Sequence, residues 1–136
     1  MNTIENVQRT FTRRAYLRCG LPKASYSERL KNLNLKSLKE CRVIADLTLV
    51  YKILHGLISI PEKQLFRRVK DVTRGHPLRI QSICPIYDDP KYWFSNRVCP
   101  VWNSLPESVV SAPNVYTFKR RLNQIQIRKS FTSKIR

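Results

Sequence analysis

Acidic residues are scarce in this sequence. Nine Asp and Glu stand against 26 Lys and Arg, which leaves a formal net charge of +17 and a pI near 10.4. Such an excess destabilises a compact chain through self-repulsion unless an anionic partner relieves it. Nucleic acid is the usual partner of so basic a domain, although a membrane surface or an acidic protein would satisfy the same balance. The charge therefore predicts an anionic partner without choosing among these classes.

Glycine and long apolar runs are also scarce. Only three glycines are present, which disfavours an all-β fold rich in tight turns. No stretch approaches the ~18 consecutive apolar residues of a transmembrane helix, so we expect no membrane as partner. Residues 1–5 do not begin a basic region followed by an apolar one, so we expect no secretory leader and an intracellular chain. A chain of 136 residues is enough for one domain with one modest core.

The sequence has no recognisable metal-binding spacing. There is no C-x-x-C pair, and His55 and His76 do not stand at zinc-finger distance from any cysteine. Buried thiols in a reducing compartment are the expectation, and a zinc site assembled by the fold is the alternative. We expect no metal and no cofactor. The four cysteines are Cys19, Cys41, Cys84 and Cys99.

Catalytic motifs are missing as well. Asp88 and Asp89 form an adjacent acidic pair, and polymerases use aspartates to hold two Mg²⁺ ions. The polymerase motif, however, has an aromatic residue two positions before the pair, where this chain has Ile86. The sequence contains no phosphate-binding loop, dinucleotide loop or nucleophile elbow. We expect a turn at the acidic pair and no catalytic residue in the chain.

The apolar spacing predicts a mainly α fold, a small domain of about five helices with a short β element around 78–87. A single helical domain is expected over 1–127, followed by a basic tail over 128–136. Pro100 is predicted to kink or interrupt its helix. A further helical turn is expected over 62–68. The predicted helical segments are 4–18, 26–33, 38–57, 91–104, 107–110 and 115–127.

Local signals place several of these elements. Ser37 and Glu40 form a capping box that starts the third helix, and Ser25 or Ser27 is the expected cap of the second. An apolar stripe runs along the first helix, with arginines elsewhere around it. The stripe consists of Ile4, Val7, Phe11 and Leu17.

Positive charge gathers at both ends of the chain. Residues 1–36 carry eight cations and two acids, and residues 114–136 carry seven cations and no acid. In the last helix the cations lie between inward-facing Phe118 and Leu122, so we expect them to point outward. Such faces neutralise phosphates without reading sequence, and the alternative is a merely solvated helix surface. The candidate nucleic-acid-binding residues are Arg9, Arg13, Arg14, Arg18, Lys119, Arg120, Arg121, Arg128 and Lys129.

Some aromatic residues lie beside these cations. Tyr16, Tyr92 and Trp93 are candidates for stacking on bases, and a place in the core is the alternative for them.

Several short motifs, in a fixed order over about residues 5–125, resemble a known family. They are similar to the segment that follows the polymerase thumb in jockey-type non-LTR retrotransposon reverse transcriptases. The motifs are Val7-Gln8-Arg9, Tyr26-Ser27-Glu28-Arg29-Leu30, Val50-Tyr51-Lys52-Ile53-Leu54-His55-Gly56, Thr73-Arg74-Gly75-His76, Phe94-Ser95-Asn96-Arg97-Val98 and Val101-Trp102-Asn103-Ser104-Leu105-Pro106.

The resemblance implies a place C-terminal to the catalytic palm and thumb, in a parent element that is a reverse transcriptase. It carries over no catalytic residues. It implies a non-catalytic fragment of an RNA-directed DNA polymerase that contacts the RNA or DNA phosphate backbone in the nucleus, with the upstream reverse transcriptase domain as a further partner. The alternatives are a structural packing module for the thumb, or a pseudogene fragment with no retained function.

Overall fold

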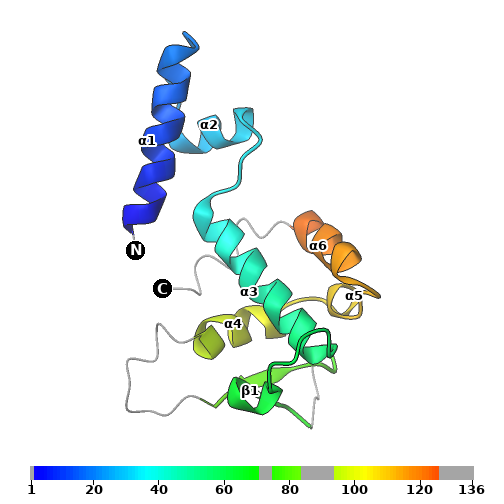
Figure 1. Cartoon of the computed structure of the whole chain (residues 1–136). Coiled ribbons are helices and arrows are strands. Elements are labelled where there is room, and N and C mark those ends of the chain that lie inside the picture. Colours follow the sequence, from blue (N-terminus) through cyan, green and yellow to red (C-terminus); the bar gives the residue numbers. More distant parts are fainter. Residues whose placement is uncertain (1, 71–74, 84–93, 126–136) are drawn as a thin grey trace. The chain divides into compact units, whose positions relative to one another are not determined.

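The computed structural model describes residues 2–70, 75–83 and 94–125 (Figure 1). The fold is mainly helical with one small antiparallel sheet, as predicted. In chain order the elements are α1 (Asn2–Arg18), α2 (Tyr26–Asn32), α3 (Leu38–Leu54), the 3₁₀ turn η1 (Glu62–Gln64), β1 (Phe66–Arg68), β2 (Ile80–Ser82), α4 (Phe94–Asn103), α5 (Glu107–Val110) and α6 (Val115–Gln124).

The sheet joins a predicted strand to an unpredicted one. β2 lies within the β element expected around 78–87, of which residues 84–87 lie outside the described residues. β1 occupies the second half of the 62–68 segment, so the helical prediction for 66–68 is wrong. The two strands run antiparallel, with Phe66 opposite Ser82 and Arg68 opposite Ile80. A strand needs a partner to satisfy its backbone, and the partner of β1 lies more than ten residues further along the chain.

Side-chain caps fix the beginnings of several helices. Ser25 accepts a hydrogen bond from the Glu28 N–H at 3.3 Å, and the Ser25 N–H donates to Glu28 Oε2 at 2.7 Å, so Ser25 caps α2. Ser37 Oγ likewise accepts from the Glu40 N–H at 3.2 Å at the start of α3. Asn114 Oδ1 accepts from the Thr117 N–H at 2.7 Å at the start of α6. These contacts explain why the starts of the helices could be predicted from the local sequence.

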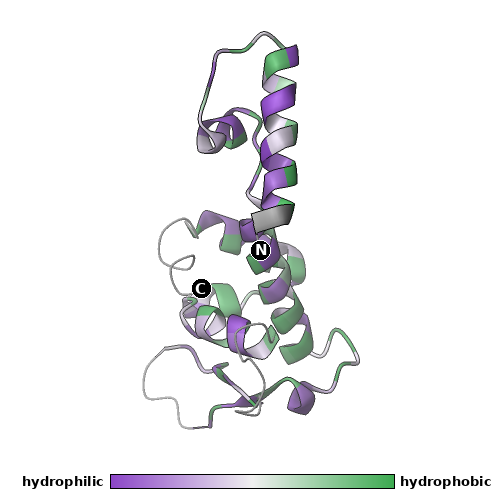
Figure 2. Cartoon of the chain, turned by 90° about the vertical axis from the view of Figure 1, so that its left-hand side faces the viewer, coloured by the Kyte–Doolittle hydropathy of each residue, from purple (hydrophilic) through white to green (hydrophobic). Residues whose placement is uncertain are grey.

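α4 continues through Pro100, so the proline does not interrupt the helix, and the kink expected there stays a prediction. The apolar stripe of α1 does not form the buried face of that helix. Ile4, Val7, Phe11 and Leu17 are between 64% and 71% exposed. Figure 2 shows hydrophobic and hydrophilic residues alternating along α1.

The chain divides into two compact units, residues 1–43 and 44–136, and the boundary falls inside α3. The single domain over 1–127 stays a prediction, and the tail over 128–136 lies outside the described residues. In the first unit α2 packs on α1, and the buried side chains there include Thr12, Tyr16 and Leu30.

Aromatic side chains form the centre of the second unit. Trp102 and Phe118 are fully buried, and their ring centroids lie 6.0 Å apart. Tyr51 stacks on Phe118 at 4.5 Å and donates its hydroxyl hydrogen to the Ala112 carbonyl at 2.5 Å. α3, α4 and α6 each contribute one of these rings, so the three helices share one core.

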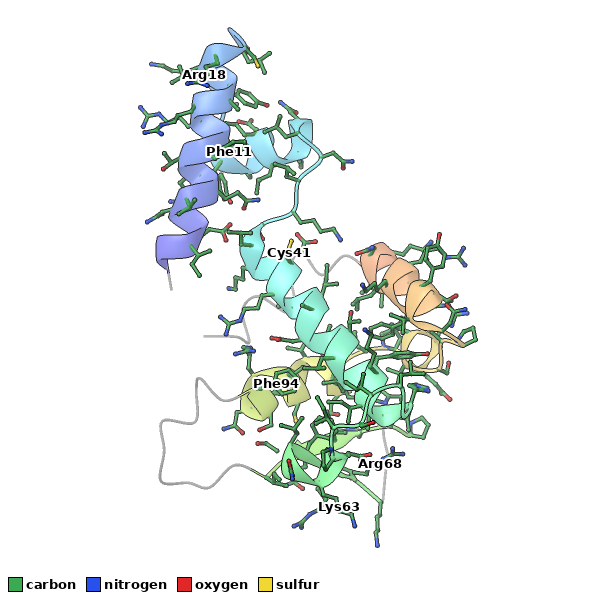
Figure 3. The ribbon with its side chains drawn as sticks, viewed as in Figure 1. Phe11, Arg18, Cys41, Lys63, Arg68 and Phe94 are labelled. Carbon is green, nitrogen blue, oxygen red and sulfur yellow. The ribbon has the colours of Figure 1, made fainter. Side chains whose placement is uncertain are left out.

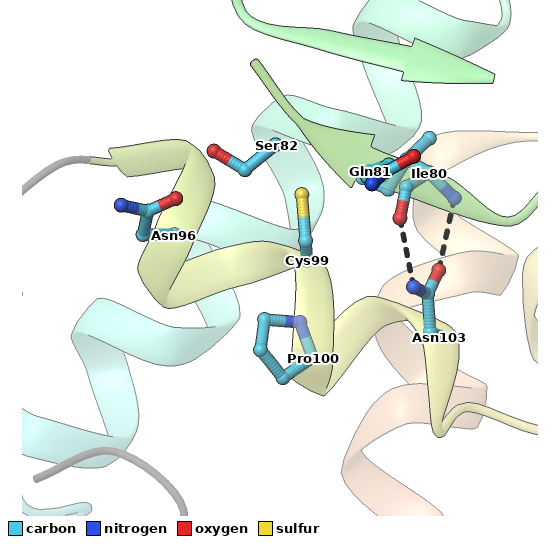
Figure 4. A pocket seen from close by; sticks show the side chains of 7 residues that line it. All are labelled: Ile80, Gln81, Ser82, Asn96, Cys99, Pro100 and Asn103. Atoms are coloured by element: carbon cyan, nitrogen blue, oxygen red, sulfur yellow. Dashed lines mark hydrogen bonds between the residues drawn. The ribbon is translucent and has the colours of Figure 1, made fainter. Parts of the chain in front are cut away.

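The end of α4 also holds the segment that leads into β2. Trp102 Nε1 donates to the Leu78 carbonyl at 2.7 Å. Asn103 Oδ1 accepts from the Ile80 N–H at 2.9 Å, and Asn103 Nδ2 donates to the Ile80 carbonyl at 2.8 Å (Figure 4). The side-chain amide therefore pairs with the strand backbone as a neighbouring strand would. His76, which is buried, donates from Nε2 to the Trp102 carbonyl at 3.0 Å.

A charged contact fixes α4 on α3. Arg97 Nε lies 2.8 Å from Asp46 Oδ2, and the two side chains are only 11% and 17% exposed. Such an ion pair is costly to break, because removal of either partner leaves a desolvated charge behind. Together with the aromatic core, this pair sets the position of α4.

We predict that Asn103→Ala lowers the free energy of unfolding by about 1–3 kcal/mol, because it leaves the buried Ile80 N–H and carbonyl without partners. Urea denaturation followed by tryptophan fluorescence measures the change. Gln81→Ala, on an exposed residue of β2, serves as the control and should shift stability by less than about 0.5 kcal/mol. Equal unfolding midpoints for Asn103→Ala and the parent would contradict the strand-pairing role of the amide.

Candidate nucleic-acid interface

The four candidate arginines of α1 are exposed, as expected of a cationic surface. Arg9 differs from the others because its guanidinium lies over the ring of Tyr26, 5.0 Å from the centroid. Figure 3 shows the side chain of Arg18 projecting from α1. Arg13, Arg14 and Arg18 therefore present their charge to solvent, whereas Arg9 also contributes to the contact between α1 and α2.

Tyr26 organises that contact. Its hydroxyl lies 2.6 Å from Glu5 Oε1 and 2.7 Å from Gln8 Oε1, and Gln8 Nε2 donates to the Lys36 carbonyl at 3.0 Å. Burial, together with the hydrogen bond to the Glu5 carboxylate, raises the pKa of Tyr26 to about 12. Glu5 is the sole acid in the α1 sequence. The carboxylate is thus hydrogen-bonded to a tyrosine, and within the described residues no ion pair joins it to an arginine of α1.

The candidate cations of α6 divide into two kinds. Lys119 and Arg120 are exposed, in agreement with the prediction that they point outward. Arg121 is only half exposed, and its guanidinium donates to the Ser108 carbonyl on α5, so the outward prediction is wrong for this side chain. Arg128 and Lys129 lie outside the described residues.

Other cations have roles in the fold. Arg29 donates to the Ala24 carbonyl at 2.6 Å and to Thr12 Oγ1 at 3.3 Å, which joins α2 to α1. Arg68 binds Glu62 at 2.7 Å and also donates to the Leu54 carbonyl at 3.1 Å. The sequence shows all of these as basic residues, and only the structure separates the cations that hold backbone from those that face solvent.

The aromatic residues near the cations are not the ones that the sequence indicated. Tyr16 is 5% exposed, so its ring is not available to a base, and Tyr92 and Trp93 lie outside the described residues. Instead Phe11 is 65% exposed and Tyr116 is 75% exposed. The sequence contains a signal that could have identified them, namely their helical spacing from arginine and lysine. The structure is needed to show that the two rings are exposed.

A shallow hollow of about 480 Å³ lies between β2 and α4 (Figure 4). Its polar side chains include Asn103, whose amide is already paired with Ile80. Burial raises the pKa of the Cys99 thiol to about 11, so this cysteine is a protonated thiol at neutral pH and a poor nucleophile. The hollow therefore offers neither a charged group nor an activated one.

Two of the described cysteines are exposed. Cys19 and Cys41 are free thiols at the surface, so the expectation of buried thiols is wrong for them and holds for Cys99, while Cys84 lies outside the described residues. In the part of the chain that the structure describes, no three His, Cys, Asp or Glu side chains gather as metal ligands would. No helix in that part has the length and apolar character needed to cross a membrane.

A scan against protein-family models finds none that matches this chain, and searches of curated proteins and of solved structures also find no match. The likeness to non-LTR retrotransposon reverse transcriptases thus rests on the sequence motifs. In the structure, His76 donates to the Trp102 carbonyl, Trp102 binds the Leu78 carbonyl, and Asn103 binds the backbone of Ile80 in β2.

We predict that Tyr26→Phe destabilises the first unit by about 1 kcal/mol at pH 7, because it removes the hydrogen bond to a carboxylate. Because folding raises the pKa of Tyr26 from 10 to about 12, this stabilisation is full below pH 10 and disappears as the pH rises through 12. Denaturation of both proteins at several pH values measures the difference. The control is Tyr116→Phe, which alters an exposed hydroxyl; an equal effect of the two substitutions would exclude the role of Tyr26.

Proposed function

We propose that this chain is a non-catalytic, nucleic-acid-contacting segment derived from a non-LTR retrotransposon reverse transcriptase. It binds the phosphate backbone of RNA or DNA through the exposed cations of α1 and α6, inside the cell and in the nucleus. The main support for this proposal is the solvent exposure of Arg13, Arg14 and Arg18 on α1. The sole acid of this helix, Glu5, is hydrogen-bonded to Tyr26. α6 contains no acid at all and exposes Lys119 and Arg120.

Helix surfaces of this kind bind without reading sequence. Each cation that meets a phosphate releases condensed counterions, so the affinity falls steeply as salt rises. Contacts to phosphates fix position and orientation but carry no base information. Non-specific complexes of this type have dissociation constants of roughly 10⁻⁴–10⁻⁶ M at physiological salt.

A second candidate function has its own observation. The apolar side chains Ile4, Val7, Phe11 and Leu17 are exposed on α1, and docking on the upstream polymerase would bury them. In that case the chain is a packing module for the thumb, and its charge is incidental. Co-purification with the upstream polymerase segment, in the absence of nucleic acid, tests this alternative. A pseudogene fragment with no function would bind neither the polymerase nor nucleic acid.

We predict that replacement of Arg13, Arg14 and Arg18 by Gln weakens binding to RNA and DNA alike, because each of them meets a phosphate. Fluorescence anisotropy with labelled oligonucleotides at several salt concentrations measures the effect. For duplex DNA, the slope of log K against log salt should flatten by roughly 0.9 for each phosphate that the variant no longer neutralises.

The matched control replaces Lys23, Lys31 and Lys63, three exposed lysines outside α1 and α6, by Gln. It removes the same net charge and should keep most of the affinity if the arginines of α1 form the contact. A dissociation constant above about 1 mM at low salt, or an affinity that does not change with salt concentration, would refute the proposed function.

A further inference from the structure

The described part of each unit contains one arrangement of side chains of the same kind. On α1, exposed Phe11 precedes Arg14 by three residues and Arg18 by seven. On α6, exposed Tyr116 precedes Lys119 by three and Arg120 by four. Residues at these spacings share one face of a helix. We call the two groups the Phe11 face (Phe11, Arg14, Arg18) and the Tyr116 face (Tyr116, Lys119, Arg120).

Each face joins an exposed ring to cations on the following turns. The ring exposes apolar area to water, although other aromatic side chains of the protein, such as Trp102 and Phe118, are completely buried. A ring of this kind offers a platform on which a nucleobase can stack, while the cations meet the flanking phosphates. Stacking tolerates any base, because every base has a π face.

We propose that the Phe11 face and the Tyr116 face bind single-stranded nucleic acid in preference to duplex, each ring stacking on an unpaired base. This inference rests on the proposed function and names its substrate class. In a duplex the bases are paired and stacked on one another, so a helix that contacts the backbone reaches phosphate and sugar but no base face. Only a single strand can cover the ring and neutralise the cations together.

A preference for single strands over duplex would distinguish base stacking from purely electrostatic binding, because the two forms differ in charge density. Duplex DNA carries one negative charge per ~1.7 Å of helix axis, about twice the density of one of its strands. A purely electrostatic surface therefore binds duplex at least as tightly as single strand. Preference for the single strand requires a contribution beyond charge, and the exposed rings supply it.

Two other occupants fit the faces less well. A second copy of the chain would bring arginines and lysines of like charge against one another. An anionic lipid surface requires enough apolar area to insert. α1 exposes several apolar side chains, but within the described part of α6 Tyr116 is the sole large hydrophobic residue that is exposed. One ring suffices to stack on a base, and it is too small to anchor a helix in lipid.

The test compares Phe11→Ala/Tyr116→Ala with the parent chain on single-stranded 20-mers of uridine or thymidine and on a 20-base-pair duplex. We expect the parent to prefer the single strands, and the double variant to bind them at least roughly fivefold more weakly. Its duplex affinity should stay within about twofold, because the cations remain. Leu57→Ala/Ile60→Ala removes two exposed apolar side chains away from both faces and serves as the control.

A second readout reports stacking directly. In Phe11→Trp and Tyr116→Trp, the added indole should lose fluorescence on binding single strands and keep it with duplex. Circular dichroism checks that the variants keep their helix content, which is expected because both positions are exposed. Unquenched indoles, together with wild-type single-strand affinity in the alanine variant, would overturn the stacking proposal.

The outcomes separate the two proposals. No binding to either oligonucleotide form defeats the proposed function and this inference with it. Equal affinity for single strand and duplex, unchanged by the alanine variant, defeats only the inference. Binding to phosphatidylserine vesicles without binding to oligonucleotides, or self-association in sedimentation that the alanine variant abolishes, would assign the faces to a lipid surface or to a second copy instead.

Discussion

The pairing of the Asn103 amide with the backbone of Ile80 is the contact on which the second unit depends. It fixes the end of α4 against β2, while the neighbouring Trp102 holds the Leu78 carbonyl and supplies the central ring of the core. α6 packs against that ring through Phe118, and α3 packs against Phe118 through Tyr51. The dipeptide Trp102-Asn103 therefore joins the sheet, the loop before it and the helical core of this unit.

The basic side chains divide between contacts within the fold and the surface of the molecule. Arg97 and Arg121 are used inside the fold, where they bind Asp46 and the Ser108 carbonyl. The other candidate cations that the structure describes are exposed on α1 and α6, and each helix also exposes one aromatic ring. Each of the two helices therefore exposes an aromatic ring and positive charge together.

The sequence predicted the features that depend on local chemistry. Ser25, Ser37 and Asn114 accept hydrogen bonds within one helical turn, so the helix starts could be read directly. β1 could not be read in the same way, because its stability comes from β2 further along the chain.

The candidate site shows the same division between local and distant causes. The exposure of Lys119 and Arg120 follows from the helical periodicity around Phe118. The hydrogen bond of Arg121, in contrast, depends on the position of the Ser108 carbonyl in α5. Phe11 is exposed, whereas the next residue, Thr12, is buried and accepts a hydrogen bond from Arg29 of α2. The two faces belong to different units of one continuous chain. Under the proposed function, a strand long enough to contact both faces would gain avidity, because the first contact raises the effective concentration of the second. The same side chains would then hold a long transcript more tightly than a short one.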